Sequence, residues 1–403
     1  MGDAEQTVVR VLPEIAEIEA GLWDGCANPP NSYDALGESY NPFLSHAFLD
    51  ALERSDSVSA ETGWAPQHLV MEDGAGRVMG CMPCYLKGHS LGEYVFDHGW
   101  ADAFARAGGD YYPKLQAAVP FTPATGRRLL VPPGPDAEHR ERLLLSAALQ
   151  LLERYEASSL HLTFLTEPEW TRLGELGLLR RTDQQFHWTN DGYSDFDDFL
   201  SSLASRKRKA IRKERREALA EGVTIDWVTG SDLDEACWDS FFGFYLDTGA
   251  RKWGTPYLNR EFFSRIGETM ADRILLIRCR RDGRDIGAAL NIIGNETLYG
   301  RYWGCSEHHR FLHFEACYYQ AIAFAIARGL KRVEAGAQGQ HKIARGYLPQ
   351  TTYSAHFIAN PSLRDAVASY LARERTFVEM ESAALAEASP FRRDASCTKS
   401  DET

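Results

Sequence analysis

Residues 298–342 read LYGRYWGCSEHHRFLHFEACYYQAIAFAIARGLKRVEAGAQGQHK, and this stretch decides how the rest of the chain is interpreted. An aromatic run predicted as a strand leads into a polar turn rich in histidine and arginine, and an apolar run with helical spacing follows. A second predicted strand, RVEA, opens into the polar loop GAQGQHK. The pattern predicts a β-turn-α-β unit with its polar residues at the turn and at the end of the last strand, where binding sites commonly form.

The sequence on either side of this unit extends the same architecture. Three successive strands, ILLIRCR, DIGAALNIIG and TLYGRYWG, are predicted as a meander that leads into the unit, and strand TTYSAHFI follows it. A looser version of this order occurs near the N-terminus, where we also predict a strand over EYVFD (residues 93–97). The expected fold class is α/β with a mixed sheet, in which one α/β unit occurs twice.

The predicted division of the chain has four parts. Residues 1–192 form the first unit and residues 193–358 the second, which begins with one long basic helix over residues 195–221. A C-terminal helix over residues 359–389 follows, and the polar tail 390–403 is expected to be disordered.

Composition excludes several classes of protein. The net charge of −13 argues against general affinity for DNA or for anionic membranes, although a local basic patch would survive that average. No secretory signal is recognised at the N-terminus, and no apolar run is long enough to span a bilayer. The cysteines are scattered without the spacing of a disulfide framework. Cys81 and Cys84 are predicted to lie in a strand and to pack in the hydrophobic core. We therefore expect a cytoplasmic protein with reduced thiols.

A basic run lies in the predicted long helix, in the segment SRKRKAIRKERREA. Its charges cover most of the helix circumference, and Arg206, Lys209 and Lys213 are candidate ligand-binding residues. Such a run is either a solvated helix face or a phosphate-binding surface for a nucleotide, a coenzyme tail or an RNA backbone. Binding that weakens with salt would distinguish the two.

The turn before the apolar helix carries several candidate site residues, Arg310, His313 and Glu315 among them. His309 and His313 are one helical turn apart, but no third ligand follows at a firm spacing and an arginine lies between them, so no metal site is predicted. Proton transfer by His or Glu in a pocket is favoured. The alternative is helix capping and surface hydrogen bonding.

The loop GAQGQHK follows the strand that carries Glu334. Polar loops at the C-terminal ends of strands bind ligands in α/β sheets, and Gly336 and Gly339 would allow close backbone approach. Gln338, His341 and Lys342 can donate hydrogen bonds to an acyl oxygen or a phosphate. The alternative is a loop stabilised by its own side chains.

The chain resembles the FemAB-like family of predicted peptidoglycan biosynthesis or recognition proteins, within the GNAT acyltransferase superfamily. The segments that carry the resemblance are MPCYLKGHSLGEYVFDHGWADAF, GGDYYPKLQAAVPFTP, SRKRKAIRKERREA, LHFEACYYQAIAFAI and EAGAQGQHKIARGYLP. The resemblance implies two tandem GNAT-like domains that transfer an acyl or aminoacyl group to an amine. The basic helix is similar to that of Fem-type aminoacyltransferases, which implies an aminoacyl-tRNA donor.

The sequence departs from the GNAT pattern at one place. Acetyl-CoA-dependent members carry a glycine-rich pyrophosphate loop where this chain has CSEHHRFLHFE, whose backbone amides are less free to bind a pyrophosphate. No tightly bound cofactor is expected. An aminoacyl-tRNA donor, or an acyl-CoA held by side chains such as Arg310, stays open.

We therefore expect an N-acyltransferase in which Glu315, Glu334 or His341 deprotonates the acceptor amine. Backbone amides of residues 336–339, with Gln338, would bind the oxyanion. Aromatic side chains would line the pocket or pack beneath it, namely Tyr302, Trp303, Tyr318 and Tyr319. The acceptor would be a small molecule or a cell-wall precursor. The alternative is a non-catalytic pair of domains that binds such a precursor or tRNA.

Overall fold

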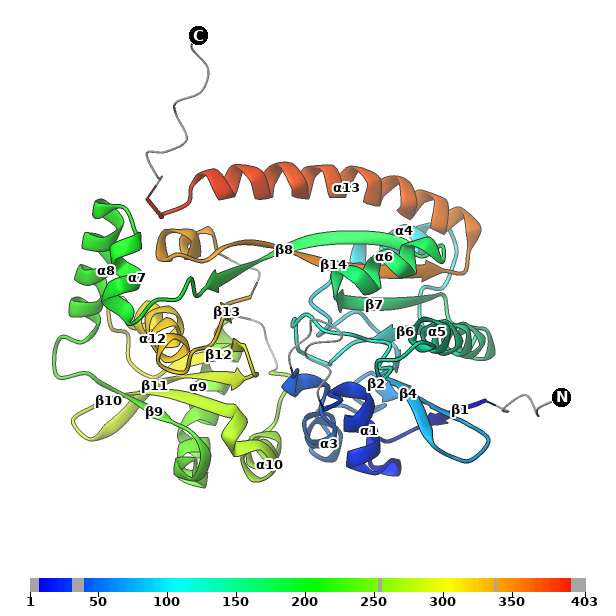
Figure 1. The fold of residues 1–403 in the computed structure, drawn as a ribbon, viewed down its shortest axis with the longest axis horizontal. Coiled ribbons are helices and arrows are strands. Elements are labelled where there is room, and N and C mark those ends of the chain that lie inside the picture. The colour runs from blue at the N-terminus through cyan, green and yellow to red at the C-terminus, as the bar shows by residue number, and fades with distance from the viewer. Residues whose placement is uncertain (1–6, 31–39, 253–255, 337–338, 393–403) are drawn as a thin grey trace, which may run out of the picture.

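A computed structural model describes residues 7–30, 40–252, 256–336 and 339–392 of the chain. Its strands form one large mixed sheet and one small antiparallel sheet, with helices on both faces of the large sheet (Figure 1). Among the described helices, none has both the length and the apolar character required to cross a bilayer.

The large sheet has eleven strands in the order β2-β5-β6-β7-β14-β8-β13-β12-β11-β10-β9. Their bounds are β2 Trp64–Pro66, β5 Tyr85–Lys87, β6 Lys114–Ala117, β7 Ser159–Leu165, β8 Leu179–Thr189, β9 Thr224–Val228, β10 Ile274–Arg281, β11 Arg284–Ile293, β12 Thr297–Cys305, β13 Arg332–Glu334 and β14 Leu348–Ile358. The small sheet contains β1 Val8–Leu12, β3 His68–Glu72 and β4 Val78–Met82. The predicted meander β10-β11-β12 is confirmed by its antiparallel pairing.

The helices that cover these sheets follow the apolar periodicity of the sequence. Their bounds are α1 Ala20–Ala27, α3 His46–Arg54, α4 His98–Arg106, α5 Ala137–Arg154, α6 Glu167–Glu175, α7 Phe196–Ser202, α8 Ser205–Ala218, α9 Glu235–Lys252, α10 Arg260–Met270, α11 Leu312–Phe314, α12 Gln320–Ala327 and α13 Pro361–Glu387. A π-helical turn, η5 Glu315–Tyr319, joins α11 to α12, and a 3-10 helix, η6 Gln340–Arg345, precedes β14.

The same strand-helix-strand unit occurs in both halves of the sheet. In the first half β6 pairs in parallel with β7 and α5 connects them, and in the second half β12 pairs in parallel with β13 across α11–α12. The expected duplication of an α/β unit is therefore confirmed. The halves also exchange strands, because β14 inserts between β7 and β8 while β13 pairs with the far side of β8. The predicted boundary at residue 192 thus follows directly after a strand shared by both.

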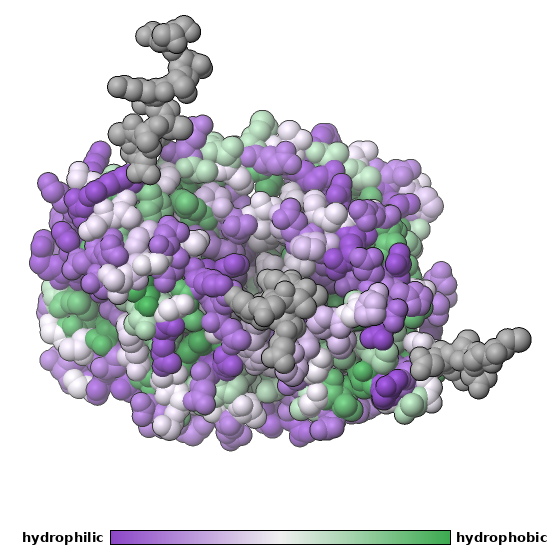
Figure 2. Space-filling view, viewed as in Figure 1, coloured by the Kyte–Doolittle hydropathy of each residue, from purple (hydrophilic) through white to green (hydrophobic). Residues whose placement is uncertain are grey.

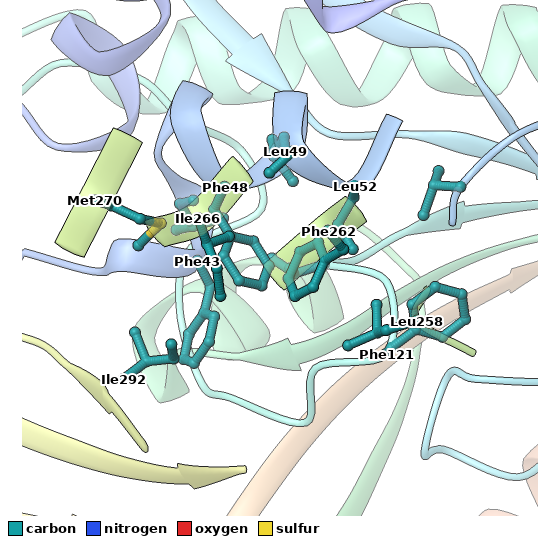
Figure 3. Packing of buried hydrophobic residues seen from close by; sticks show 14 of the residues in the cluster. Phe43, Phe48, Leu49, Leu52, Phe121, Leu258, Phe262, Ile266, Met270 and Ile292 are labelled. Carbon is teal, nitrogen blue, oxygen red and sulfur yellow. The ribbon is translucent and has the colours of Figure 1, made fainter. Parts of the chain in front are cut away.

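Aromatic side chains of the two halves pack against each other (Figure 3). Phe48 of α3 and Phe262 of α10 make an edge-to-face contact with their ring centroids 5.8 Å apart, and Phe43 packs in the same way on Tyr299 of β12. Truncating a buried phenylalanine costs about 3–5 kcal/mol. The halves therefore share one hydrophobic core.

The basic helix is shorter than predicted. The structure has two helices, α7 and α8, separated at Leu203 and Ala204. Leu203 is extended and forms a β-bridge with Phe391, and the amide of Ala204 donates to the carbonyl of Pro390 at 2.9 Å. Tertiary pairing with the C-terminal segment thus interrupts the helix, and residues 390–392 are ordered. The remainder of the predicted tail, 393–403, lies outside the described residues.

The predicted strand over residues 93–97 is wrong. Those residues form no strand, although β-branched and aromatic side chains made one plausible. Their polar side chains point into the molecule, where they bond to the side chains of Lys114 and Tyr111. Hydrogen bonds and ion pairs of the side chains therefore hold residues 93–97 in place of the backbone hydrogen bonds of a strand.

Candidate functional site

The large sheet opens at the end of β13. Of the described residues of β12, Thr297, Leu298 and Tyr299 alone pair with β13, although β12 continues to Cys305. The polar loop of residues 336–342 leaves from this point, at the carboxyl end of a parallel strand pair. Such ends are preferred places for ligands in α/β sheets.

Glu334 lies at the point where the pairing ends. It is directly opposite His187 of β8, and its side chain is buried. Burial raises the pKa of the Glu334 carboxyl to about 7, and the nearby cations Arg332 and Arg301 only partly oppose this effect. A carboxyl group with such a pKa can accept a proton from a substrate at neutral pH.

His187 lies opposite Glu334, with 3.9 Å between its Nε2 and Oε2 of the carboxyl group. Burial lowers the pKa of His187 to about 3, with help from Arg332 and Lys342, so the imidazole is neutral. Its Nε2 also lies 3.3 Å from Oε1 of Gln185, whose amide nitrogen donates to the carbonyl of Pro123 at 2.7 Å. We call Glu334, His187, Gln185 and Arg301 the Glu334 site.

Arg301 and Tyr302 connect the Glu334 site to the first half of the chain. Arg301 donates to the carbonyl of Phe121, and the hydroxyl of Tyr302 lies 3.4 Å from the same oxygen. The Tyr302 ring packs edge-to-face on Tyr245 of α9 at 5.1 Å. The predicted pocket residue Tyr302 therefore lies in the aromatic core between the halves.

The other predicted aromatic residues belong to the opposite face of the sheet. Trp303 contacts the ring of His313 at 5.7 Å, and His313 contacts Tyr318 at 5.5 Å. His341 of η6 completes this aromatic group, with its Nε2 3.1 Å from the hydroxyl of Tyr318 and its ring 5.4 Å from Phe314. Partial burial and the cations Arg345 and Lys342 lower the pKa of His341.

The loop after β13 is closed by its own lysine. The Lys342 ammonium is buried and donates to the carbonyls of Ala335 and of Gly336, the latter at 3.0 Å. Burial lowers the pKa of this amine to about 8. Gly336 and Gly339 have φ of +73° and +102°, in the region that favours glycine. Lys342 thus binds the start of this loop through two carbonyl groups. Gln338 lies outside the described residues.

Glu315 is engaged in an ion pair. Its carboxylate accepts from Nη2 of Arg215 at 3.0 Å, from Nε of the same arginine, and from the amide of Gln320 at 2.7 Å. The side chain is completely buried in the π-helical turn. These contacts join α8 to the start of the apolar helix. Of the two glutamates predicted as bases, Glu315 is therefore the one whose carboxylate is bound by donors of the protein.

The basic helix α8 has an inner and an outer face. On the inner face Glu214 accepts from Arg345 at 2.8 Å and from the hydroxyl of Tyr319. On the outer face Arg206, Lys209 and Lys213 are exposed. A groove of about 360 Å³ lies between α8 and η6, lined by Arg206, Lys207, Ala210, Ile211, Glu214, Tyr319, Ala344 and Arg345. Figure 2 shows hydrophilic side chains over this end of the molecule.

Carboxylates balance the cations of the turn before α11. Glu307 lies 3.0 Å from Nε2 of His309 and 3.2 Å from Arg281, and Arg310 pairs with Glu217 of α8 at 3.2 Å. Phe311 has a φ of +64°, which makes the turn sharp without glycine. Within the described ranges, no three His, Cys, Asp or Glu side chains are placed to share a metal ion.

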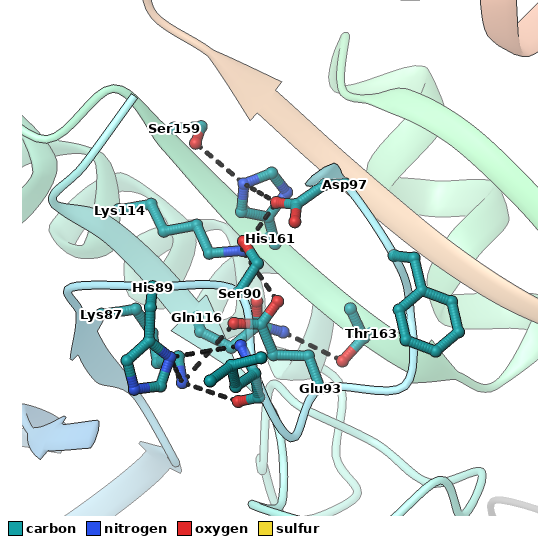
Figure 4. A network of polar contacts seen from close by, with 12 residues as sticks. Lys87, His89, Ser90, Glu93, Asp97, Lys114, Gln116, Ser159, His161 and Thr163 are labelled. Carbon is teal, nitrogen blue, oxygen red and sulfur yellow. Dashed lines mark hydrogen bonds and ion pairs between the residues drawn. The ribbon is translucent and has the colours of Figure 1, made fainter. Parts of the chain in front are cut away.

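The sequence analysis missed two sets of residues. His187 and Gln185 alternate with the core residues Phe186 and Trp188 along β8, a period-2 signal that was present in the sequence. A second buried polar network surrounds Lys114 in the first half (Figure 4). Its members come from separate strands and from residues 88–97, and their meeting is a property of the tertiary structure. Cys81 and Cys84 are buried, as predicted.

Comparison with known proteins gives one family and one fold. The profile of the FemAB-like family, described as peptidoglycan biosynthesis/recognition, matches residues 14–393. The structure of FemX is similar with a TM-score of 0.50 and 13% identity, covering 78% of this chain and 93% of FemX. L-PGS from Bacillus licheniformis is similar with a TM-score of 0.50 and 8% identity, and the match covers 83% of this chain and 98% of L-PGS.

A tandem GNAT protein from the clavulanic acid biosynthesis pathway has a TM-score of 0.47 and 15% identity, covering 88% of this chain and 99% of that protein. Curated protein sequences give no match. The chain shares its fold with FemX and L-PGS, and its own strand-helix-strand unit occurs twice. With nearly its whole length matched, the chain belongs to the FemAB-like family of peptidoglycan biosynthesis/recognition proteins.

Proposed function

We propose that this protein is an N-acyltransferase in which Glu334 is the general base for an acceptor amine. The observation that carries the proposal is the position of this carboxyl group, buried at the opening of the sheet with a pKa of about 7. An ammonium group must lose a proton before its nitrogen can attack an ester or thioester, and a base with a pKa near neutrality can take that proton.

The neighbouring groups suit this role. Because His187 is neutral, Glu334 meets no imidazolium that would hold the carboxylate in a permanent ion pair. Arg301 lies close enough to favour the ionised carboxylate. Attack of the amine nitrogen on the donor carbonyl forms the new C–N bond. The C–O or C–S bond to the donor then breaks, and the departing oxygen or sulfur takes up the second proton released by the nitrogen. The acceptor we propose is an amine of a cell-wall precursor, in keeping with the family.

The donor would approach from the face that carries α8. Exposed cations on α8 and the groove beside η6 provide a surface for the phosphates of a large donor, which supports aminoacyl-tRNA. Arg310 pairs with Glu217, so a coenzyme pyrophosphate would have to displace that carboxylate. An acyl-CoA is the second donor to be tested.

The experiment is a donor and acceptor screen with product detection by mass spectrometry. Wild-type protein and Glu334→Gln are incubated with charged tRNA or acyl-CoAs and with muropeptide precursors. We expect a mass increase of the acceptor by one acyl or aminoacyl group, and its near absence with Glu334→Gln. Binding of a precursor without any product would instead identify a non-catalytic recognition protein. Full turnover by Glu334→Gln would exclude this residue as the base.

A further inference from the structure

The outer side of the C-terminal helix α13 carries apolar side chains that the proposed chemistry does not use. In Figure 1 this helix runs along the edge of the molecule, and it contacts β8 and β14 of the large sheet. Its inner side is buried, since Leu363, Val367 and Leu371 pack with Trp100 in one apolar cluster. That cluster holds α13 on the protein but does not involve the outer side.

A second apolar row lies beside the buried one. Tyr370, Phe377 and Met380 are 42%, 60% and 61% exposed. Ala366 and Ala384, which are also exposed, extend the row toward both ends of the helix. Successive residues of a helix are about 100° apart around its axis, so the row is centred roughly 100° from the buried residues. Contiguous exposed apolar surface of this kind marks a site of interaction, whereas single exposed residues do not.

The spacing of the row is that of a coiled coil. With Arg373 included, its members lie at positions 366, 370, 373, 377, 380 and 384, separated alternately by four and three residues. Residues at this spacing are the a and d positions of a heptad, which pack into the facing side of a second helix. We call these six residues the α13 seam. The occupant of the seam is therefore expected to be a helix.

The α13 seam is complementary to itself when two copies run antiparallel. About a two-fold axis beside residue 375, Arg373 of one copy faces Phe377 of the other, and Tyr370 faces Met380. A guanidinium over a phenylalanine ring and a thioether beside an aromatic ring are both favourable contacts. A parallel pair would instead place Arg373 opposite Arg373, where the like charges repel. One charged residue in the seam thus selects the antiparallel pair.

The seam adjoins a further exposed aromatic residue in the first half of the chain. Arg181 of β8 donates to Glu374 of α13 and to the carbonyl of Phe96, both at 2.8 Å. The hydroxyl of Tyr370 donates to the same glutamate at 2.9 Å. Phe96 is 61% exposed, so its ring adds to the apolar surface at this end of the seam.

The exposed area suits a reversible dimer. From the usual surface areas of such residues, Tyr370, Phe377, Met380 and Phe96 together expose on the order of 400 Å² per copy. Two copies would bury about 800 Å² from these side chains, and neighbouring atoms would add to a total near the lower limit of about 1,200 Å² for specific interfaces. An interface of this size gives a weak association that depends on the protein concentration.

The charge of α13 argues against a membrane as the occupant. Helices that lie on membranes are rich in lysine and arginine on their polar face. α13 contains three basic and five acidic residues, namely Arg364, Arg373, Arg375, Asp365, Glu374, Glu379, Glu381 and Glu387. The heptad spacing and the antiparallel match therefore favour a second copy of the chain.

We propose that the α13 seam is a homodimer interface, through which two copies of the chain pack antiparallel about a two-fold axis. Each copy contributes the same residues, as a two-fold interface requires. The inference goes beyond the proposed function and does not depend on it, because neither Glu334 nor the groove beside α8 contributes a residue to the seam.

Sedimentation velocity of the full chain over a range of concentrations tests the interface. We expect a reversible monomer–dimer equilibrium with a Kd on the order of 1–10 µM. Phe377→Glu places a carboxylate in the seam and should weaken association at least ~10-fold, and Met380→Glu should do the same. Leu22→Glu is the matched control, since Leu22 of α1 is 47% exposed and lies outside the seam. It should leave the equilibrium unchanged, and urea unfolding checks that every variant is folded.

Cysteine variants test the orientation of the two helices. A mixture of Tyr370→Cys and Met380→Cys chains should form a covalent dimer on mild oxidation, because these positions face each other in the antiparallel pair. Neither variant should cross-link efficiently alone. Wild-type protein treated in the same way reports any cross-linking through the native cysteines.

A wild-type chain that stays monomeric at about 100 µM would overturn the proposal. So would a dimer that both Phe377→Glu and Met380→Glu leave intact, or efficient cross-linking of Tyr370→Cys alone, which indicates a parallel pair. Binding of a monomer to phosphatidylcholine vesicles through Phe377 would assign the seam to a membrane instead. None of these measurements uses turnover, so a failure of the Glu334 assignment leaves the dimer test unaffected.

Discussion

Glu315 and Glu334 lie in the same strand-helix-strand unit and are both buried, yet their surroundings differ. Glu315 accepts hydrogen bonds from Arg215 and Gln320, at distances between 2.7 and 3.2 Å. The Glu334 carboxyl group lies 3.9 Å from Nε2 of His187, and His187 is neutral. The first carboxylate belongs to an ion pair between two elements, whereas the second is free to exchange a proton.

Burial by itself therefore does not mark a catalytic carboxyl group. Desolvation raises the pKa of a carboxyl, and charge-assisted hydrogen bonds lower it again. Donors converge on Glu315, whose side chain joins α8 to the start of the apolar helix. No described residue donates a hydrogen bond to Glu334, and its pKa of about 7 suits a general base.

The largest expected effect is on turnover by Glu334→Gln. The amide has nearly the shape of the carboxyl group but cannot accept a proton, so kcat should fall at least ~10²-fold. Single-turnover kinetics on the acceptor identified by the screen provide the measurement. Glu72→Gln is the control, because Glu72 pairs with Arg10 in the small sheet. A loss below threefold would mean that another group takes the proton.

The next effect concerns stability as a function of pH. The folded-state pKa of Glu334, about 7, exceeds the ordinary value of 4.5, so the folded protein binds this proton more tightly than the unfolded chain. Its stabilising contribution is complete below pH 4.5 and is lost as the pH rises through 7, by on the order of 3 kcal/mol. Urea unfolding of wild type and Glu334→Gln at pH 5 and pH 8 should show the wild type losing more stability. Parallel losses would contradict the raised pKa.

A smaller effect is expected for Glu315→Gln. Removing one partner of a buried ion pair leaves the other charge unpaired, but the Arg215 side chain is 26% exposed and can reach water. We expect a loss of about 2 kcal/mol in the free energy of unfolding, below the range for fully buried pairs. A double-mutant cycle with Arg215→Met isolates the pair. An unchanged stability together with lost turnover would reverse the roles assigned to the two glutamates.

The smallest effect concerns the outer face of α8. We consider single alanine replacements of Arg206, Lys209 and Lys213. Each should weaken the binding of tRNA that carries no amino acid only a few-fold. Each should also lower the number of counterions released on binding, measured from the salt dependence of the affinity, by about one. Titrations at several salt concentrations measure both quantities. Asp197→Ala is a control, since this residue pairs with Arg212 on the surface. Binding without salt dependence would indicate a solvated helix face.

Local patterns predicted much of the fold correctly. The meander β10-β11-β12 and the helix α5 have strong hydrophobic periodicity, and their partners lie close in sequence. The basic helix was predicted too long, because residues 390–392, distant in sequence, pair with its interruption. The strand over residues 93–97 failed for a related reason, since its polar side chains bond to Lys114.

Three features could be predicted from the order of residues: the duplicated α/β units, the basic patch and the position of Glu334 at the end of a strand. Each depends on neighbouring residues or on periodicity. Which polar residues meet depends on the folded chain. Glu334 faces His187 because β8 and β13 pair, and Lys114 meets Glu93 and Asp97 because residues 88–97 lie against β6. Proton affinity and ion pairing depend on distances between side chains that the order of residues does not specify.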